Sequence, residues 1–343
     1  MSRIRAAIVG FGHAGAVFHA PLLASIPDYA IAAIVTSNAE RRERAARDYP
    51  AAAIVASADE LWERASEFDL VVVASPNRAH VPHAIAALAA GLHVVVDKPL
   101  ATSAADARRV IAEARRRDRL LTVFHNRRWD GDFLTVRRLL TAGALGEIWR
   151  FESRFERWRP APREGWRESR DPDEGGGLLF DLGSHLIDQA LLLFGPVADM
   201  YAELDRRRPG VVVDDDTFVA LRHASGVRSH LWMSSASALP GPRMRVLGSR
   251  GAYVKYGMDV QEDALRAGAR PNDPGFGDDA PERYGWLGAG DGVDVVTTER
   301  GAYQDFYVAL ARSLRDGTPL PVDPDDAVNV LEIIDAIRAR CRR

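Results

Sequence analysis

Two carboxylates and an imidazole interrupt an apolar segment of the chain. The segment GGGLLFDLGSHLIDQALLLFG spans residues 175–195 and carries Asp181, His185 and Asp188 at spacings of four and three. On a helix, these spacings place the three side chains on one face, about a turn apart. An imidazole between two carboxylates can accept, hold or donate a proton. These three side chains also need hydrogen-bonding partners, because each unpaired buried polar group lowers stability by roughly 1–3 kcal/mol.

The same three residues could instead have purely structural roles, and this alternative stays open. Asp181 could cap the helix and His185 could be a hydrogen-bonded core histidine, which is the better interpretation of an isolated Asp-x-x-x-His pair. The three glycines before the helix either allow the backbone to approach a ligand closely or give the helix a flexible entry. Asp188 is expected either to support the other two side chains or to contact a substrate.

A glycine-rich turn follows the first apolar stretch, IRAAIVGF at residues 4–11. Glycines at these spacings allow a tight turn, close approach of a pyrophosphate and close packing of helix on strand. The start of the next helix offers free N–H groups and a positive dipole end. A dinucleotide is therefore expected here, although a glycine turn in a nucleotide-free fold has the same sequence. The residues expected to bind it are Gly10, Phe11, Gly12, His13, Ala14 and Gly15.

The end of the second expected strand indicates which dinucleotide binds. A carboxylate there would bind the ribose 2′-hydroxyl of NAD, whereas a basic residue accommodates the 2′-phosphate of NADP. The strand ends in VTSN and has no carboxylate at its tip, and two arginines follow one turn later. This favours NADP, with NAD as the second choice. The residues concerned are Thr36, Ser37, Asn38 and Arg41. Alternatively, Ser37 and Glu40 form a capping box and the arginines face solvent.

Two further motifs follow later strands, at the carboxyl ends where open α/β sheets bind ligands. The expected cofactor contacts are Ser75, Pro76, Asn77 and His80 from SPNRAH, and Asp97, Lys98 and Pro99 from DKP. A lysine at this edge can donate a hydrogen bond or a proton. The proline after it could fix the turn through a cis bond. A DKP motif alone would more often be a surface loop.

The elements that position these residues change character along the chain. Expected strands alternate with helices over the first 125 residues, which predicts a doubly wound parallel sheet of Rossmann type. The strands are expected at 4–11, 29–37, 69–76, 93–99 and 120–126. The later chain is expected to form an α+β domain with a large, mostly antiparallel open sheet. We predict a Rossmann domain at 1–124 and a substrate-binding and oligomerisation domain at 125–343, whose last helix could pack back on the first domain. Residues 268–292 are rich in Gly, Pro and Asp and are expected to form a long functional loop.

Composition excludes several classes of protein. The 343 residues carry a formal net charge of −3, so no basic field indicates nucleic acid. The single cysteine permits no internal disulfide and no cysteine-based metal site, and no metal is expected. The chain has no run of about 18 apolar residues and no signal-peptide pattern. We therefore expect a cytoplasmic protein that contacts no membrane.

The motifs together resemble the Gfo/Idh/MocA oxidoreductases. The resemblance depends on GFGHAG at 10–15, SPNRAH at 75–80, DKP at 97–99 and GGGLLFDLGSHLID at 175–188. Four more motifs are similar to those of NADP-dependent scyllo-inositol dehydrogenases and their uncharacterised relatives. These are FHNRRWDGDF at 124–133, WRP at 158–160, GWRE at 165–168 and YGMDVQEDALRAG at 256–268. One difference is that Asp97 replaces the family's usual glutamate, which shortens a carboxylate near the cofactor.

The resemblance implies three catalytic residues, Lys98, Asp181 and His185. His185 would remove a proton from a secondary hydroxyl while hydride leaves the same carbon, and Asp181 would orient the imidazole. Lys98 would hydrogen-bond the reacting oxygen. The cofactor supplies the redox chemistry.

The implied substrate is a polyol or sugar, with a scyllo-inositol-like cyclitol favoured. The residues expected to bind it are Lys98, Asn126, Arg127, Trp158, Trp166, Arg167, Asp181 and His185. Asn126 is also expected to contact the cofactor, Arg128 is a further candidate, and Tyr284 and Trp286 could close over the site. The alternatives are a dehydrogenase of another sugar or ketose and a dinucleotide-sensing regulatory protein without catalysis. The family commonly self-associates through its second-domain sheet, so a homodimer or homotetramer is expected.

Overall fold

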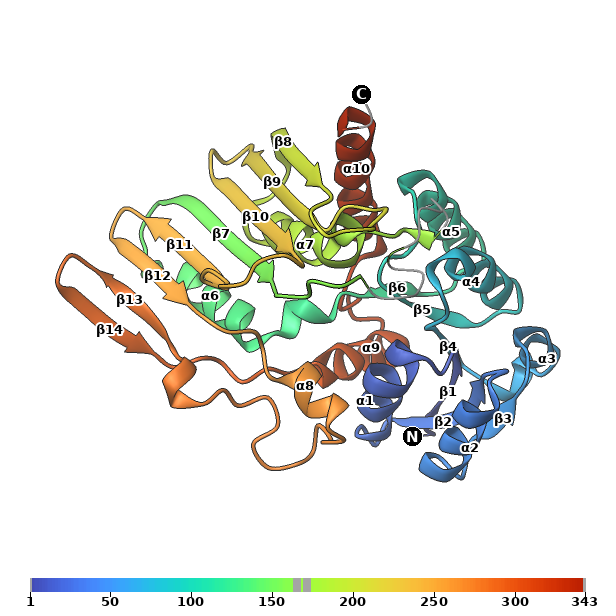
Figure 1. Ribbon diagram of the computed structural model, residues 1–343. Helices are drawn as coiled ribbons and strands as arrows, with labels where there is room; N and C mark the ends of the chain where they lie inside the picture. The colour runs from blue at the N-terminus through green and yellow to red at the C-terminus, as the bar shows by residue number, and fades with distance from the viewer. Residues whose placement is uncertain (1, 163–167, 169–173, 342–343) are drawn as a thin grey trace. The chain divides into compact units, whose positions relative to one another are not determined.

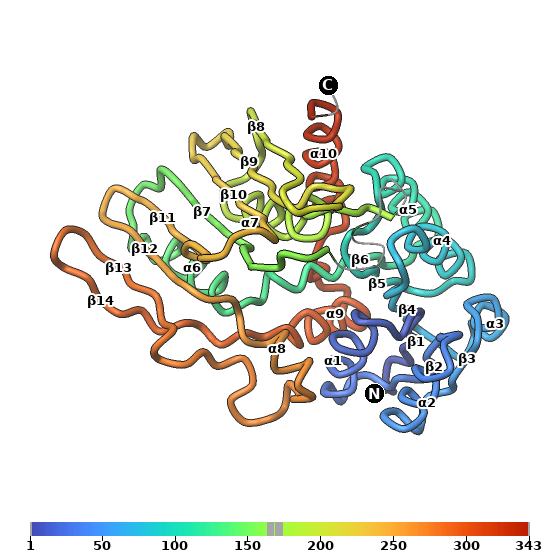
Figure 2. Tube along the Cα trace, viewed as in Figure 1, coloured from blue at the N-terminus to red at the C-terminus, as the bar shows by residue number. Residues whose placement is uncertain are grey.

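The computed structural model describes residues 2–162, 168 and 174–341. Contacts divide the chain into two compact units (Figures 1 and 2). The first unit contains the chain up to Asn126 together with the segments Gln261–Phe276 and Ala302–Asn329. The second contains Arg127–Val260, Gly277–Gly301 and the chain from Val330 onward. The predicted domain boundary after residue 124 stays a prediction.

A six-stranded parallel sheet forms the centre of the first unit, in the order β3-β2-β1-β4-β5-β6. Its strands are β1 (Ile4–Val9), β2 (Tyr29–Val35), β3 (Ala53–Val55), β4 (Leu70–Val73), β5 (His93–Asp97) and β6 (Leu121–Phe124). The order reverses between β1 and β4, and this switch point is where such sheets bind ligands. Strands β4 and β6 are buried along their whole length, as expected of strands covered on both faces.

Helices connect these strands and flank the sheet. They are η1 (Ala14–His19), α1 (Ala20–Ala24), α2 (Ala39–Asp48), α3 (Ala58–Glu63), η2 (Ala65–Glu67), η3 (Asn77–Ala79), α4 (His80–Ala89) and α5 (Ala104–Arg116). Later segments add α8 (Gln261–Arg266), α9 (Gln304–Asp316) and the beginning of α10 (Pro324–Cys341). The stretch η1 is a single π-helical turn that runs into α1, and such turns are frequent at functional sites.

An eight-stranded open sheet forms the centre of the second unit, in the order β14-β13-β12-β11-β7-β10-β9-β8. Its strands are β7 (Ile148–Glu156), β8 (Val197–Asp205), β9 (Asp216–His223), β10 (Arg228–Ser234), β11 (Met244–Gly248), β12 (Gly251–Lys255), β13 (Gly285–Ala289) and β14 (Gly292–Val296). Neighbouring strands are antiparallel, except that β7 and β10 are parallel.

Helices pack on one face of this sheet (Figure 1). They are η4 (Asn126–Trp129, whose first residue belongs to the first unit), α6 (Gly131–Thr141), η7 (Leu179–Gly183), α7 (Ser184–Phe194) and the later part of α10; a short η8 (Pro281–Arg283) precedes β13. Side chains on the helix side, such as Phe151, Leu231 and Val246, are buried. The opposite face carries a row across the strands that includes Tyr201, His230, Trp286 and Val295.

The predicted fold class is confirmed: a doubly wound parallel sheet accompanies a large, mostly antiparallel one. Strand β3 was missed, because three residues are too few to show a pattern. The expected loop at 268–292 is wrong for residues 285–289, which form β13 and pair with β12 and β14. Trp286 therefore lies in a strand rather than in a loop. Among the described residues, no helix is long and apolar enough to span a membrane.

Candidate active site

The glycine turn after β1 has the geometry that a dinucleotide requires. Gly10 has φ +101°, and a Cβ there would lie 2.6 Å from the carbonyl oxygen of Ala74, at the end of β4. A Cβ on Gly15 would lie 2.0 Å from the carbonyl oxygen of Gly10. At Gly12, by contrast, the nearest atom to such a Cβ would be Arg41 Nη1, at 3.6 Å. Packing thus requires the outer two glycines, whereas Gly12 leaves room for a ligand to approach the backbone.

Helix α2, which follows β2, presents an arginine to this turn. The Asn38 side chain accepts a hydrogen bond from the Arg41 N–H at 2.9 Å and caps α2. The alternative capping box of Ser37 and Glu40 is therefore wrong by one residue. Thr36 is buried, its N–H donates to Val55, and Ser37 is exposed. With Arg41 beside Gly12 and no carboxylate at the strand tip, the arrangement suits an anionic group on the ribose.

His80 ties the ends of β4 and β5 together. Its Nδ1 lies 2.8 Å from the carbonyl oxygen of Pro99, and its Nε2 lies 2.8 Å from that of Ser75. Burial lowers the pKa of His80, an effect that these two carbonyl acceptors and the charge of Asp97 oppose. The Lys98–Pro99 bond is cis, as the sequence suggested. His80 thus holds together the segments that follow β4 and β5, at the edge of the sheet where the cofactor is expected. Asn77 is buried at the same edge.

A buried chain of polar groups supports Asp97. The His19 ring, at the end of η1, lies 3.4 Å from Asp97 Oδ1 through Nε2 and 2.7 Å from the Tyr307 hydroxyl through Nδ1. Burial raises the pKa of Asp97, but the hydrogen bond and charge of His19 and the charges of His80 and Lys98 outweigh it, so that the pKa lies below its ordinary value. His19 and Tyr307 were not predicted from the motifs; a histidine within an apolar helix was the available signal.

Asp181 and His185 lie one turn apart in the second unit, where η7 runs into α7. Asp181 does not cap this helix, since the capping position is Leu178 and Asp214 Oδ2 accepts the Leu179 N–H at 2.7 Å. A Cβ on Gly177, which has φ +96°, would lie 2.0 Å from Asp214 Oδ1. The glycine run therefore makes room for this acceptor. Asp214 was not predicted from the sequence.

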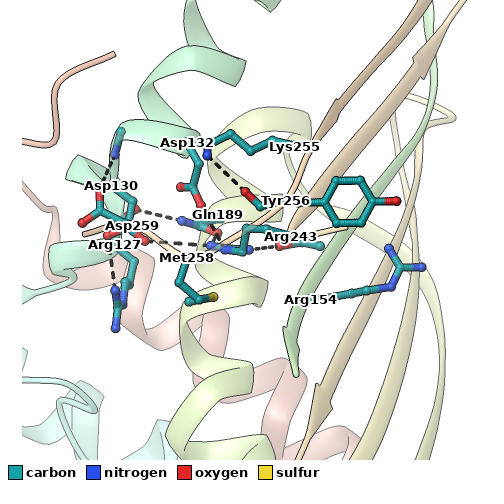
Figure 3. Close-up of polar contacts among 12 residues, drawn as sticks. Arg127, Asp130, Asp132, Arg154, Gln189, Arg243, Lys255, Tyr256, Met258 and Asp259 are labelled. Carbon is teal, nitrogen blue, oxygen red and sulfur yellow. Dashed lines mark hydrogen bonds and ion pairs between the residues drawn. The ribbon is translucent and has the colours of Figure 1, made fainter. Parts of the chain in front are cut away.

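The next turn of α7 is anchored by its polar residues. Asp188 accepts two hydrogen bonds from Arg128, from Nε at 2.8 Å and from Nη2 at 2.5 Å, and both side chains are buried. This pairing is what the supporting role of Asp188 requires, and the choice between its two expected roles stays a prediction. Arg128, a further candidate for polyol binding, is engaged in this pair. Gln189 Nε2 donates to the Arg127 carbonyl oxygen at 2.8 Å (Figure 3).

Arg243, the residue directly before β11, lies at the centre of a buried polar cluster behind α7 (Figure 3). Its guanidinium donates to Ser153 Oγ at 2.5 Å and to Gln189 Oε1 at 3.3 Å, and its Nε lies 3.0 Å from Asp132 Oδ2. Asp130 lies in the same cluster, and burial raises its pKa, which the charge of Arg127 opposes. Through Arg243 these contacts join α7 to β7, to α6 and to the segment before β11, and so help to fix the helix that continues from η7.

Arg127 and His185 meet at one aromatic ring. The His185 and Phe155 rings form a T-shaped pair, with the ring centroids 6.2 Å apart. The Arg127 guanidinium carbon lies 5.4 Å from the Phe155 centroid. The structure thus brings together two residues that were predicted to contact the substrate.

The other predicted residues are distributed differently. The residues predicted to bind the cofactor, including Lys98 and the buried Asn126, follow the ends of β1, β2, β4, β5 and β6. Trp158 is 58% exposed and makes an isolated bridge to Ala236. Trp166 and Arg167 lie outside the described residues. Within the part of the chain that the structure describes, no cluster of His, Cys, Asp and Glu could hold a metal ion.

Comparison with known proteins places the sequence among oxidoreductases. Residues 4–125 match the model "Oxidoreductase family, NAD-binding Rossmann fold", and residues 137–343 match "Oxidoreductase family, C-terminal alpha/beta domain". The scyllo-inositol 2-dehydrogenase (NADP(+)) IolW of Bacillus subtilis (strain 168) is 37% identical over 97% of this chain and 92% of its own length. The oxidoreductase YdgJ of Escherichia coli (strain K12) is 40% identical over 97% of this chain and 94% of its own length. The solved structure of the oxidoreductase YvaA from Bacillus subtilis superposes with a TM-score of 0.92 and 36% identity, covering 98% and 95% of the two chains.

Proposed function

Because the chain belongs to the Gfo/Idh/MocA oxidoreductase family and contains its NAD-binding Rossmann domain, we propose that it is a dehydrogenase of a cyclitol or sugar. The favoured substrate is scyllo-inositol or the corresponding inosose, and the favoured cofactor is NADP. One observation carries the reaction type: Asp181 and His185 lie one turn apart where η7 runs into α7, and the buried Arg128–Asp188 ion pair holds this helix in place. The substrate rests on the similarity to the B. subtilis enzyme, which spans 97% of the chain.

In this proposal the residues of the chain handle the proton and orient the substrate. The nicotinamide, when bound, accepts or supplies the hydride. His185 takes the proton from the secondary hydroxyl, a task that suits an imidazole because its ordinary pKa lies near neutral pH. Asp181 orients the ring and stabilises its cation. Lys98 donates a hydrogen bond to the reacting oxygen and stabilises its developing charge. Arg127 and Asn126 bind further hydroxyl groups, together with Trp158, Trp166 and Arg167.

The preference for NADP is supported by Arg41 and by the polar, uncharged tip of β2. Arg41 Nη1 lies next to Gly12, and Ser37 stands where an NAD-specific site would place a carboxylate. An arginine can bind a phosphate through two parallel hydrogen bonds. The expected result is a higher kcat/KM with NADP than with NAD for the same polyol.

The test is nicotinamide absorbance with a panel of inositol isomers, aldoses and ketoses, measured with NAD and NADP separately. Turnover of scyllo-inositol with NADP supports the proposal. A preference for another sugar keeps the reaction and replaces the substrate. If the cofactor binds and no polyol or carbonyl compound changes the absorbance, the chain is a dinucleotide sensor and the proposed catalysis is wrong.

We further propose that the chain is a cytoplasmic homodimer or homotetramer that associates through the open face of its eight-stranded sheet. This face carries Tyr201, Trp286 and Val295, which are 60%, 40% and 64% exposed. Trp232 lies on it under Arg154, whose guanidinium carbon is 3.8 Å from the ring centroid. Contiguous exposed apolar patches are typical of contact surfaces, which supports this choice of face. A monomer in sedimentation equilibrium would contradict this assembly.

A further inference from the structure

The motif VQEDALRAG at 260–268 packs against the glycine turn. Helix α8, formed by Gln261–Arg266, belongs to the first unit and contacts η1 (Figures 1 and 2). Gln261 is fully buried, and its Oε1 accepts the Tyr303 N–H at 2.8 Å. Leu265 is buried as well. These two residues fix the rotation of α8 about its axis and thereby determine which side chains face the turn.

The segment after α8 is held at two more points of the same unit. The Asn272 side chain donates to the Ser25 carbonyl oxygen at 2.9 Å. Arg270 forms a side-chain hydrogen bond with Tyr49, whose ring packs against Phe11 in the glycine turn, with centroids 6.1 Å apart. The segment 261–276 is therefore attached along the turn, although more than 200 residues of chain separate the two.

Arg266 is the basic residue of α8, and it lies beside the turn. Its Nη2 lies 3.3 Å from Nε2 of His13, the residue directly after Gly12. The same nitrogen donates to Glu262 Oε1 at 2.5 Å, and that carboxylate lies 3.8 Å from His13 Nε2. The Arg266 side chain is 46% exposed, so solvent reaches about half of it beside the turn.

We infer that Arg266 binds the diphosphate of the dinucleotide. The inference rests on the proposed function for the identity of the cofactor. The diphosphate lies over the glycine turn in this type of fold, and an arginine fork matches the geometry of phosphate oxygens. Arg266 approaches His13 from α8, whereas Arg41 approaches Gly12 from α2. The two arginines thus bind different phosphate groups: Arg266 binds the diphosphate and Arg41 binds the 2′-phosphate.

Binding measurements with cofactor fragments separate these two roles. ADP-ribose carries the diphosphate without a 2′-phosphate, and 2′-AMP carries the 2′-phosphate without a diphosphate. In isothermal titration calorimetry, R266A is expected to weaken ADP-ribose, NADH and NADPH by the same factor, about tenfold, as for one charge-assisted hydrogen-bonded contact. Its affinity for 2′-AMP should stay within about twofold of wild type. R41A should show the reverse pattern, with losses for 2′-AMP and NADPH alone.

R109A is the matched control. Arg109 is an exposed arginine of α5 in the same unit, paired with Asp106 at 3.4 Å, so its removal changes the net charge equally. It should alter none of the four affinities. Equal binding of ADP-ribose by R266A and wild type would overturn the inference, as would a loss confined to ligands with a 2′-phosphate. The assay needs no substrate, so an error in the proposed polyol leaves it intact, and wild-type affinities for NADPH and NADH test the cofactor preference separately.

Discussion

Removing one partner of the Arg128–Asp188 pair should strongly destabilise the protein. The two side chains are only 8% and 3% exposed and share two hydrogen bonds, so water cannot replace the missing partner. Breaking such a buried pair from one side typically costs about 3–5 kcal/mol, because the other charge stays buried without compensation. We expect D188L to lower the free energy of unfolding by this amount.

Removing both charges should recover much of the loss. In the double variant R128M/D188L, apolar side chains of similar volume replace the pair, and neither ion has to be desolvated. Replacement of a whole buried pair is often neutral or stabilising. We therefore expect the double variant to regain at least half of the stability that D188L loses.

Urea unfolding followed by circular dichroism measures both effects, provided that the denaturant slope m is unchanged. The control is D325A, which breaks the exposed Arg115–Asp325 contact of 2.6 Å, where the side chains are 68% and 52% exposed. Its midpoint should match that of wild type, since exposed pairs contribute little. If D188L and the double variant unfold at the same urea concentration, the loss comes from packing and the charge argument is refuted.

Three further predictions concern catalysis, cofactor choice and pH. H185A should lower kcat by roughly two to four orders of magnitude with an unchanged NADPH dissociation constant. In the double variant H185A/K98A, the loss of kcat should be much smaller than the product of the two single losses. Near-normal turnover of H185A, or a loss in the double variant equal to that product, contradicts this. S37D/R41A should shift the kcat/KM ratio toward NAD, and an unchanged ratio would assign the 2′-phosphate to other residues. Because burial lowers the pKa of His80 from 6.5, the unfolded chain binds more protons below that pH. The urea concentration at the unfolding midpoint should therefore decrease as the pH is lowered from 7.5 to 5.5. A midpoint that does not change over this range refutes the prediction.

Local patterns predicted the parts of the site that depend on neighbouring residues. Gly10, Gly12 and Gly15 follow a strand and precede a helix, and their roles depend on backbone geometry within a few residues. The spacing of Asp181 and His185 likewise requires only a helix. Even the error at the start of α2, where Asn38 rather than Ser37 is the cap, is a displacement by one position.

Partners distant in sequence could not be predicted in this way. His19 contacts Tyr307 at a separation of 288 residues, and Gln189 contacts Arg243 at a separation of 54. Such pairs are determined by how the elements pack, which a single sequence does not display. Strand β13 was missed for a different reason. Its sequence GWLGA resembles a loop, and it is a strand because β12 and β14 supply its hydrogen bonds.

The polar residues of α7 combine two roles on one helix. Asp188 and Gln189 bind groups of η4 and the Arg243 side chain, which precedes β11, and these contacts fix the position and rotation of the helix. Asp181 and His185 lie one to two turns earlier, so the backbone transmits that rotation to the imidazole over only a few residues. A catalytic group must be held within a fraction of an ångström of its productive position. In the proposed mechanism, the buried Arg128–Asp188 pair would therefore serve catalysis as well as stability, by holding the helix that carries His185. It follows that R128M/D188L, even when well folded, should show a lower kcat than wild type at an unchanged NADPH dissociation constant; a fully active double variant would show that packing alone positions His185.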